Sequence, residues 1–378
     1  MRFSDRSAHL DLPNALAKRL LAAPPRLDLT VSNPTTAGLP YAAEAIRAAL
    51  GSARSLVYEP DPLGLRSARE RIAADEGVAL GKVAITASTS EAYAILFKLL
   101  SDPGDEILVP VPSYPLLAWL AQYDGVVLKT YPLVYAGSWH VDLDSLREAV
   151  GPRTRAIVVV HPNNPTGSYL GRGELDAMLD LGLPIISDEV FATYPLGTLR
   201  SDRIATVAHE TRGLVFALSG LSKLVGLPQM KLGWIVAGGD EGVVAPAMAR
   251  LENLLDAYLS VGTPVQAALP ALLEAGRTTA DAIRERTRKN LDVARGIFAT
   301  SAGNILDVEG GWYVTLRIPE TMTDEQWAMA MLDEGVSVQP GYFFDMHHGA
   351  HLVASLLTHP EVFREGMEII ATVVEERA

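Results

Sequence analysis

The chain has 378 residues, enough for two domains, and its 48% hydrophobic and 20% charged residues are typical of a globular protein. Its formal net charge of −13 argues against nucleic acid or an anionic membrane surface as a partner, because both attract clustered Lys and Arg. The chain contains no Cys, which excludes disulfides, thiolate nucleophiles and Cys-ligated zinc.

The longest apolar runs, such as RAIVVV, are far shorter than the roughly 20 residues that a membrane helix needs. The first 20 residues contain no apolar segment of the kind found in secretion signals. We therefore expect no membrane partner and a cytoplasmic location, with which a chain free of Cys is compatible.

Between residues 83 and 237, short apolar runs alternate with helix-like segments. The runs are KVAIT, EILVPV, GVVLKTY, RAIVVVH, LPIISD, LVFALS and LGWIVAG, and the clearest helical segments are EAYAILFKLLSD and RGELDAMLDLG. Continuous apolar strands separated by helices predict a mostly parallel sheet that is covered on both faces. We expect an α/β fold with a three-layer α/β/α large domain around a seven-stranded sheet.

The pattern changes after residue 240. A long charged helix is predicted over DAIRERTRKNLDVARGIFATS, followed by a strand in GWYVTLRIP, a helix in TDEQWAMAMLDEG, strands in VSVQP and AHLVASLL, and a closing helix. This order is typical of a smaller α+β domain. The predicted boundaries are residues 41–265 for the large domain, and residues 1–40 with 266–378 for the small domain.

Polar clusters come directly after five of the predicted strands. They are Ser88-Thr89-Ser90, Pro112-Ser113-Tyr114, HPNNPTG, Asp188-Glu189 and Ser222-Lys223. In open parallel sheets, ligands bind at the carboxyl ends of the strands. We therefore expect the five clusters to converge in one crevice.

Lys223 and Asp188 are the two charged candidates at these strand ends. A desolvated lysine can attack an aldehyde and form a Schiff base, although a lysine can also simply cover apolar surface with its stem. A carboxylate at the end of an apolar strand is costly unless it is paired, and a protonated pyridine nitrogen is a suitable partner. The alternative for Asp188 is a structural cap on the next helix.

Two further candidates can contact an aromatic ring and its oxygen. Asn164, fixed in the NPTG loop by Pro165, can donate to an oxygen, although such a loop is often only a turn. Tyr114, in PSYP, offers a flat face on which an aromatic ring can stack.

Ser88, Thr89 and Ser90 stand where a helix is predicted to begin. Hydroxyls and free backbone N–H groups at a helix N-terminus can hold a phosphate, but Ser and Thr are also common N-caps, and both alternatives stay open. Ser222 and Lys231 can add contacts to the same phosphate.

Together these groups suit an aldehyde, a ring nitrogen, a phenolic oxygen, a phosphate and a stacked aromatic ring. All five belong to pyridoxal 5′-phosphate, which is therefore the predicted cofactor. No metal site is predicted.

The sequence resembles the class I/II aminotransferases, which are pyridoxal-phosphate enzymes of fold type I. The resemblance covers nearly the whole chain, through SNPTTAGLPY, YEPDPLGLRSARERIA, ITASTSEAYAIL, PVPSYP, HPNNPTG, SDEVF, SGLSKLVGLPQMKLGW, EGGWYV and VQPGYFF. It implies that Lys223 forms the Schiff base and moves the proton between Cα and the cofactor. It also implies that Asp188 pairs the pyridine nitrogen, Asn164 contacts the ring oxygen and Tyr114 stacks. Tyr58 is expected to reach the phosphate of a neighbouring subunit, so a homodimer with shared sites is predicted.

Three positions near the cofactor depart from the family pattern. Phe191 stands where a Tyr usually shares the ring oxygen with Asn, so the Schiff base is expected to hold its proton more tightly. Lys231 stands where an Arg usually forks onto the phosphate, and a lysine offers only a point charge. Gly220 occupies a usual Ser position, with Ser219 one place earlier.

The largest departure concerns the substrate. Val353 stands where the family commonly has the Arg that holds the substrate carboxylate, and no Lys or Arg occurs between residues 318 and 363. Bidentate recognition of a carboxylate by this segment is therefore not expected. The candidate substrate contacts are Asn33, His351 and Trp312, although a His is often structural and Trp312 can equally belong to the core.

The predicted function is pyridoxal-phosphate-dependent transfer of an amino group between an amino acid, or a related amine, and a 2-oxo acid. A first alternative is a lyase acting by C–S cleavage or β-elimination, or another Cα-modifying enzyme of the same fold, because Lys223 serves all of these reactions. A second alternative is a non-catalytic cofactor-binding or regulatory protein, against which both Lys223 and Asp188 are present.

Overall fold

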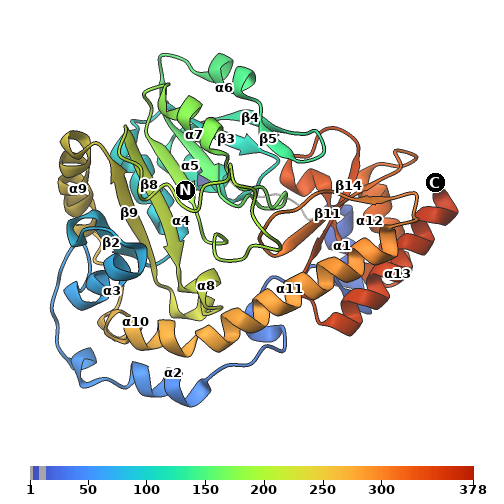
Figure 1. Cartoon of the computed structure of the whole chain (residues 1–378), viewed down its shortest axis with the longest axis horizontal. Coiled ribbons are helices and arrows are strands. Elements are labelled where there is room, and N and C mark those ends of the chain that lie inside the picture. Colours follow the sequence, from blue (N-terminus) through green and yellow to red (C-terminus); the bar gives the residue numbers. More distant parts are fainter. Residues whose placement is uncertain (1–2, 8–13) are drawn as a thin grey trace.

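The computed structural model describes residues 3–7 and 14–378, and none of the helices in these ranges is long and apolar enough to cross a membrane. Figure 1 shows a large α/β part and a smaller part around β11 (Tyr313–Ile318) and β14 (Ala350–Ser355). The long helix α11 (Arg277–Phe298) runs along both parts.

The large domain is built on one sheet, to which eight strands contribute among the described residues. In sheet order they are β2 (Val83–Thr86), β9 (Gly233–Gly239), β8 (Leu214–Gly220), β7 (Ile185–Asp188), β6 (Thr154–Val160), β3 (Glu106–Val111), β4 (Val127–Tyr135) and β5 (Trp139–Val141). The neighbours from β8 to β4 run parallel, whereas β9 is antiparallel to β2 and β8. The mostly parallel sheet is thus confirmed, and all seven predicted strands are present.

The predicted number of strands is one too few, because β5 was not expected. This strand pairs antiparallel with the end of β4, where Tyr135 lies opposite Trp139. With three residues at the edge of the sheet, β5 is too short to produce the alternation or the apolar run by which a strand is recognised in a sequence.

Both faces of the sheet are buried, and alternate residues of one strand belong to different cores. Ile157 packs with the helices of one face and Val158 with those of the other. The first face is covered by α3 (Arg66–Glu76), α6 (Leu143–Ala149), α7 (Arg172–Leu179) and α10 (Thr263–Ala275), and the second by α4 (Thr89–Leu100), α5 (Leu116–Asp124) and α9 (Glu241–Asp256). This double burial explains why the strands read as continuous apolar runs.

The small domain has an antiparallel sheet packed against helices. Its strands are, in sheet order, β10 (Asn304–Ile305), β11, β14 and β13 (Gln339–Pro340), and its helices are α11, α12 (Asp324–Asp333) and α13 (Pro360–Arg377). The N-terminal segment joins it, since α1 (Ala15–Ala22) contributes Leu16 to this core and β1 (Leu27–Asp28) pairs with β12 (Val336–Ser337).

The remaining helical elements are short connections within or between these layers. They are α2 (Ala43–Leu50), α8 (Leu221–Leu224), η1 (Asp5–Ser7), η2 (Pro34–Thr36), η3 (Ala53–Leu56), η4 (Leu80–Lys82), η5 (Pro228–Met230) and η6 (Gly341–Phe344).

The junction of α10 and α11 lies next to the segment that carries Lys223. Leu269 of α10 packs in the core of the large domain and Leu291 of α11 in that of the small domain. The core to which the chain contributes thus changes between α10 and α11, on either side of Gly276, and the predicted boundary at residue 265 stays a prediction. A Cβ atom at Gly276 would lie 2.4 Å from Cβ of Val225, so glycine allows the close approach.

Two helical glycines give a matched test of how closely α13 packs against Leu29 in the small domain. In α13, a Cβ atom at Gly366 would lie 2.4 Å from the buried Leu29, whereas at Gly296 of α11 it would meet no atom within 4 Å. Gly366→Ala is expected to lower the free energy of unfolding by roughly 1–3 kcal/mol through overpacking. Gly296→Ala is expected to raise it by roughly 0.5–1 kcal/mol through helix propensity. Urea unfolding measures the change in unfolding free energy for both variants. Changes of the same sign in the two variants would contradict the close contact between Gly366 and Leu29.

Candidate active site

The carboxyl ends of β2 and β8 meet at the amino end of β9. Thr86 of β2 and Gly220 of β8 both pair with Gly233. A Cβ atom on Gly233 would lie 3.1 Å from the carbonyl carbon of Ser88 and 3.2 Å from the backbone nitrogen of Thr89. Glycine at this position therefore lets the start of α4 lie directly beside the end of β8.

The first turn of α4 combines a cap with unpaired hydroxyls. Ser88 is the N-cap, and its Oγ accepts a hydrogen bond of 3.2 Å from the backbone N–H of Glu91. Thr89, Ser90 and, across the edge, Ser222 make no side-chain hydrogen bond to any residue that the structure describes. For Ser88 the capping alternative is thus correct, while the turn as a whole keeps groups that suit an anion.

Lys231 lies at the same edge, two residues before Gly233. It is exposed and has a left-handed backbone conformation with φ of 50° at the end of η5. The predicted contact of Lys231 with a phosphate stays a prediction.

Lys223 lies in α8, with its amine against aromatic rings. Nζ is 5.2 Å from the centre of the Trp312 ring and 5.9 Å from that of Phe191. Burial lowers the pKa of the Lys223 ammonium below its usual value, while the negative charge of Asp188 acts in the opposite direction. A lysine in such surroundings carries a neutral amine at a lower pH than a surface lysine does.

Asp188 ends β7 and has two hydrogen-bond donors. The hydroxyl of Tyr93 donates to Oδ2 at 3.2 Å and the N–H of Val190 to Oδ1 at 3.2 Å. Burial nevertheless raises the pKa of Asp188 to about 6, because these donors and the charge of Lys223 offset only part of the desolvation. The carboxylate therefore lacks a full partner and suits a cationic ligand.

Asn164 is a buried carboxamide without an internal partner. The neighbouring Asn163 holds the loop by accepting hydrogen bonds from the N–H and the hydroxyl of Thr166. By contrast, Oδ1 of Asn164 is buried and has no hydrogen bond among the described residues. Buried amide groups are nearly always paired, so the orphaned Oδ1 suits a hydrogen-bond donor, while Nδ2 of the same carboxamide can donate to an oxygen.

Aromatic side chains form a wall beside Lys223. Phe191 meets Trp312 edge-on at 5.2 Å between ring centres and Tyr313 at 6.3 Å. Burial, with a smaller contribution from the nearby Tyr114, raises the pKa of Tyr313 to about 12. The half-exposed Tyr114 thus lies near this wall, which is compatible with the stacking role predicted for it.

Of the three predicted substrate contacts, only Trp312 is shown to lie against Lys223. Asn33 is exposed and is the N-cap of η2. Its Oδ1 accepts hydrogen bonds from the backbone N–H and the hydroxyl of Thr35. Nδ1 of the buried His351 has no hydrogen-bond partner among the described residues, and the backbone N–H of His351 donates to Oδ1 of Asp324 at 2.9 Å. Burial lowers the pKa of His351 to about 4, so this side chain is neutral near pH 7.

Val353 is fully buried in an apolar cluster with Phe344 and Met346, and Tyr313 packs against that cluster. Apolar side chains thus occupy this part of β14, where a cation would be needed to hold a carboxylate. The geometry agrees with the expectation that this segment does not recognise a carboxylate.

Sequence reasoning missed two tyrosines of the site. Tyr93 lies on the buried face of α4, so helical periodicity was a usable signal for its inward direction. Tyr194, whose hydroxyl donates to the backbone carbonyl of Lys223 at 2.7 Å, lies in a turn after β7 without periodicity. Nothing in the local pattern distinguished Tyr194 from a core aromatic.

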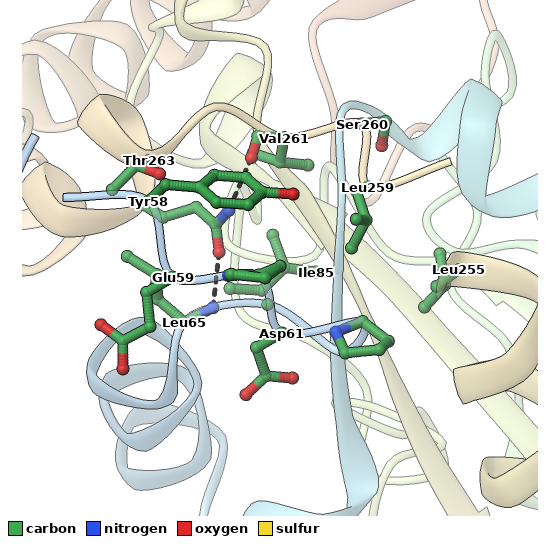
Figure 2. Close-up of a pocket in the computed structure, with 14 residues that line it drawn as sticks. Tyr58, Glu59, Asp61, Leu65, Ile85, Leu255, Leu259, Ser260, Val261 and Thr263 are labelled. Carbon is green, nitrogen blue, oxygen red and sulfur yellow. Dashed lines mark hydrogen bonds between the residues drawn. The ribbon is translucent and has the colours of Figure 1, made fainter. Parts of the chain in front are cut away.

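Tyr58 lies apart from these groups and is 79% exposed. Figure 2 shows it on a pocket between the loop before α3 and the start of α10, where the loop before α10 contributes Val261 and α10 itself contributes Thr263. The predicted contact of Tyr58 with a neighbouring subunit stays a prediction.

Comparisons with known proteins match this architecture. The sequence is 26% identical to tyrosine aminotransferase of Mus musculus over 360 residues, covering 89% of this chain and 78% of that protein. Over 199 residues it is 31% identical to S-alkyl-thiohydroximate lyase of Arabidopsis thaliana, covering 50% of this chain and 42% of that protein. The solved structure of an alanine aminotransferase from Pyrococcus furiosus superposes with a TM-score of 0.84 at 25% identity, covering 100% of both chains.

The sequence model of the family described as "Aminotransferase class I and II" matches residues 24–362. The predicted family and the predicted fold type are therefore confirmed, and the chain belongs to the class I and II aminotransferases.

Proposed function

We propose that this chain is a pyridoxal-phosphate-dependent aminotransferase that moves an amino group between an amino acid, or a related amine, and a 2-oxo acid. The observation that carries the proposal is the placement of two buried, oppositely charged groups at the ends of the neighbouring strands β7 and β8. Lys223 has a lowered pKa, and Asp188 has a raised pKa and lacks a full partner. Such opposed shifts at one site are typical of catalytic groups.

The residues present fit pyridoxal phosphate. Asp188 suits the protonated ring nitrogen, Nδ2 of the buried Asn164 carboxamide can donate to the ring oxygen, and the first turn of α4 suits the phosphate. Ser222 and Lys231 lie at the same edge of the sheet. When bound, the cofactor supplies an aldehyde carbon and a ring that accepts the electron pair of a broken Cα–H bond.

Each residue then has a task that its surroundings support. The neutral amine of Lys223 would be the group that holds the aldehyde carbon of the bound cofactor, and its Nζ would accept and return a proton. Asp188 keeps a proton on the ring nitrogen by its negative charge. Phe191 and Trp312 exclude water from the amine, and Phe191 leaves the ring oxygen to Asn164 alone because it has no donor.

A lyase remains the second candidate, and one observation favours it. Half of the chain is similar to S-alkyl-thiohydroximate lyase of Arabidopsis thaliana. The same lysine and the same carboxylate serve elimination as well as amino transfer. The two reactions differ in one requirement, since only amino transfer needs a 2-oxo acid as acceptor.

The cytoplasmic location stays a prediction. We further propose that the protein is a homodimer. Exposed apolar side chains gather on the two loops that border the pocket in Figure 2. They are Leu56, Val57, Tyr58, Tyr258 and Leu259. Apolar groups gathered on one face are typical of a surface that another chain covers.

The function is tested by comparing Lys223→Ala with Lys289→Ala, a change of an exposed lysine. The wild-type protein and Lys289→Ala, mixed with pyridoxal phosphate, are expected to show a protein-bound band at about 420 nm that Lys223→Ala lacks. Addition of amino donors should bleach the band, and a 2-oxo acid should restore it. Absorbance spectra and product analysis measure these changes.

Two results would change the assignment. Identical spectra for the wild-type protein and Lys223→Ala would exclude Lys223 as the reacting amine. Release of a 2-oxo acid and ammonia without any acceptor would instead identify the protein as a lyase.

Asp188→Asn is expected to have opposite effects on stability and on cofactor binding. The folded-state pKa of about 6 lies above the ordinary value of 3.8, so ionised Asp188 destabilises the fold at pH 7.5 and protonated Asp188 does not. Removing the charge should raise the unfolding free energy of the cofactor-free protein by roughly 1–3 kcal/mol. Cofactor binding should weaken at least about tenfold, because the partner of the ring nitrogen is lost.

Urea unfolding between pH 4 and 8 and a cofactor titration measure the two effects. The wild-type protein should lose stability relative to Asp188→Asn as the pH rises through 6. Asp142→Asn is the control, because Asn can keep the cap that Asp142 gives to Ser145. A destabilised Asp188→Asn protein with unchanged cofactor affinity would contradict the assignment.

The shared site is tested by mixing two inactive variants, Tyr58→Ala and Lys223→Ala. In a two-fold dimer, random mixing makes about half of the dimers mixed, with one subunit of each variant. Each mixed dimer has one site that carries both defects and one site that is intact. Activity should therefore return to about one quarter of the wild-type value. Mixing Tyr58→Ala with the double variant should restore nothing, and the absence of any recovery in the first mixture would count against a shared site.

A further inference from the structure

Tyr194 makes direct contact with the main chain of the segment that carries Lys223. Its side chain has no exposed surface, and its hydroxyl donates to the carbonyl oxygens of Lys223 at 2.7 Å and of Leu224 at 3.1 Å. These are the two residues at the end of α8. The hydroxyl thus lies where it can fix the position of the peptide from which the Lys223 side chain extends.

Tyr194 is itself held on three sides. Its ring meets Trp312 edge-on at 5.2 Å, and its carbonyl accepts a hydrogen bond of 2.9 Å from Gly311. The Arg284 guanidinium lies 5.5 Å from the centre of the ring, while Nε of Arg284 donates to the carbonyl of Thr193 at 3.0 Å. Tyr194 therefore connects Lys223 to Trp312, the ring that faces Nζ, and to helix α11.

The segment around Lys223 needs such support from outside. Helix α8 has only four residues, no side-chain cap at its start, and Gly226 with φ of 65° just after its end. A helix of one turn gains little stability from its own hydrogen bonds. The position of the Lys223 backbone therefore depends on tertiary contacts, of which the Tyr194 hydroxyl is a direct one.

We propose that Tyr194 is a positioning residue for Lys223: its hydroxyl holds the Lys223 and Leu224 carbonyls so that Nζ stays against the rings of Trp312 and Phe191. The proposal deepens the proposed function, because it concerns the amine that reacts there. Phe191 itself carries no hydroxyl. Tyr194, three residues later, carries one, and it acts on Lys223 through the lysine backbone.

Loss of the hydroxyl has a predictable chemical consequence. Two buried carbonyls lose a donor, so the turn shifts to find water or another partner. Water that reaches the turn also hydrates Nζ, and the desolvation that lowers the pKa of Lys223 is reduced. The neutral amine then becomes scarcer at a given pH.

The test compares Tyr194→Phe with Tyr131→Phe. Tyr131 is equally buried, and its hydroxyl also donates to a backbone carbonyl, that of Val158 at 2.7 Å, but it does not contact the Lys223 segment. Both changes keep the ring and remove one buried hydrogen bond. A purely structural loss should therefore affect the two variants alike.

The measurement is the pH dependence of Lys223 acetylation by acetic anhydride in the cofactor-free protein, read by peptide mass spectrometry with Lys289 as the internal reference. In Tyr194→Phe the midpoint for Lys223 is expected to rise by about one pH unit, so that its reactivity near pH 7.5 falls about tenfold. Tyr131→Phe and the wild-type protein should share one midpoint. Arg284→Gln, which removes the contact on the outer side of Tyr194, should shift the midpoint upward by less.

A Lys223 midpoint in Tyr194→Phe equal to that in Tyr131→Phe would overturn the proposal. Should Tyr194→Phe fail to fold in thermal unfolding, an unshifted midpoint in Arg284→Gln would overturn it instead. The proposed function is judged separately by the absorbance band with pyridoxal phosphate. A shift in midpoint without any such band in the wild-type protein would support the positioning role and reject the cofactor.

Discussion

The site depends on the removal of water from two opposite charges that lie at neighbouring strand ends. Burial lowers the pKa of Lys223 and raises that of Asp188, and each charge offsets part of the shift of the other. Neither residue can be dehydrated by its own strand alone, because both stand at the open edge of the sheet. For Lys223 the rings of Phe191 and Trp312 contribute to this dehydration, and Trp312 immediately precedes the first long strand of the small domain.

The two domains therefore contribute different parts of one site. The large domain provides strand ends with polar groups and the ring of Phe191, and the small domain adds Trp312 and Tyr313 to the wall that excludes water. Hydrogen bonds join the domains close to these residues: Gly310 donates to Gly167, the last residue of the NPTG loop, and Gly311 donates to Tyr194. A displacement of residues 310–312 would consequently change the loop of Asn164 and the surroundings of Lys223 together.

The sequence predicted the features that depend on composition and periodicity. Seven strands of the large sheet were recognisable because burial on both faces makes their sequences continuously apolar, and the polar residues after them were expected to converge. Strand β5 was missed because three residues carry no period. The capping role of Ser88 was left open, since Ser suits a cap and an anion site equally well.

Features that depend on tertiary contact could not be read from the sequence. A turn directs the hydroxyl of Tyr194 toward the Lys223 carbonyl. Arg284, whose guanidinium lies over the Tyr194 ring, belongs to a helix and comes 90 residues later in the chain. Asn33 and His351 were chosen for their chemical type, but Asn33 is occupied as a cap, and His351 is buried beside Asp324.

The apolar surface near the active lysine also limits what can bind there. Phe191 contacts Tyr313, and Tyr313 packs against the cluster of Val353, Phe344 and Met346, so apolar side chains continue from Lys223 to the middle of β14. A carboxylate placed against this surface would lose hydration without gaining a cation. These side chains therefore suit apolar groups better than a carboxylate.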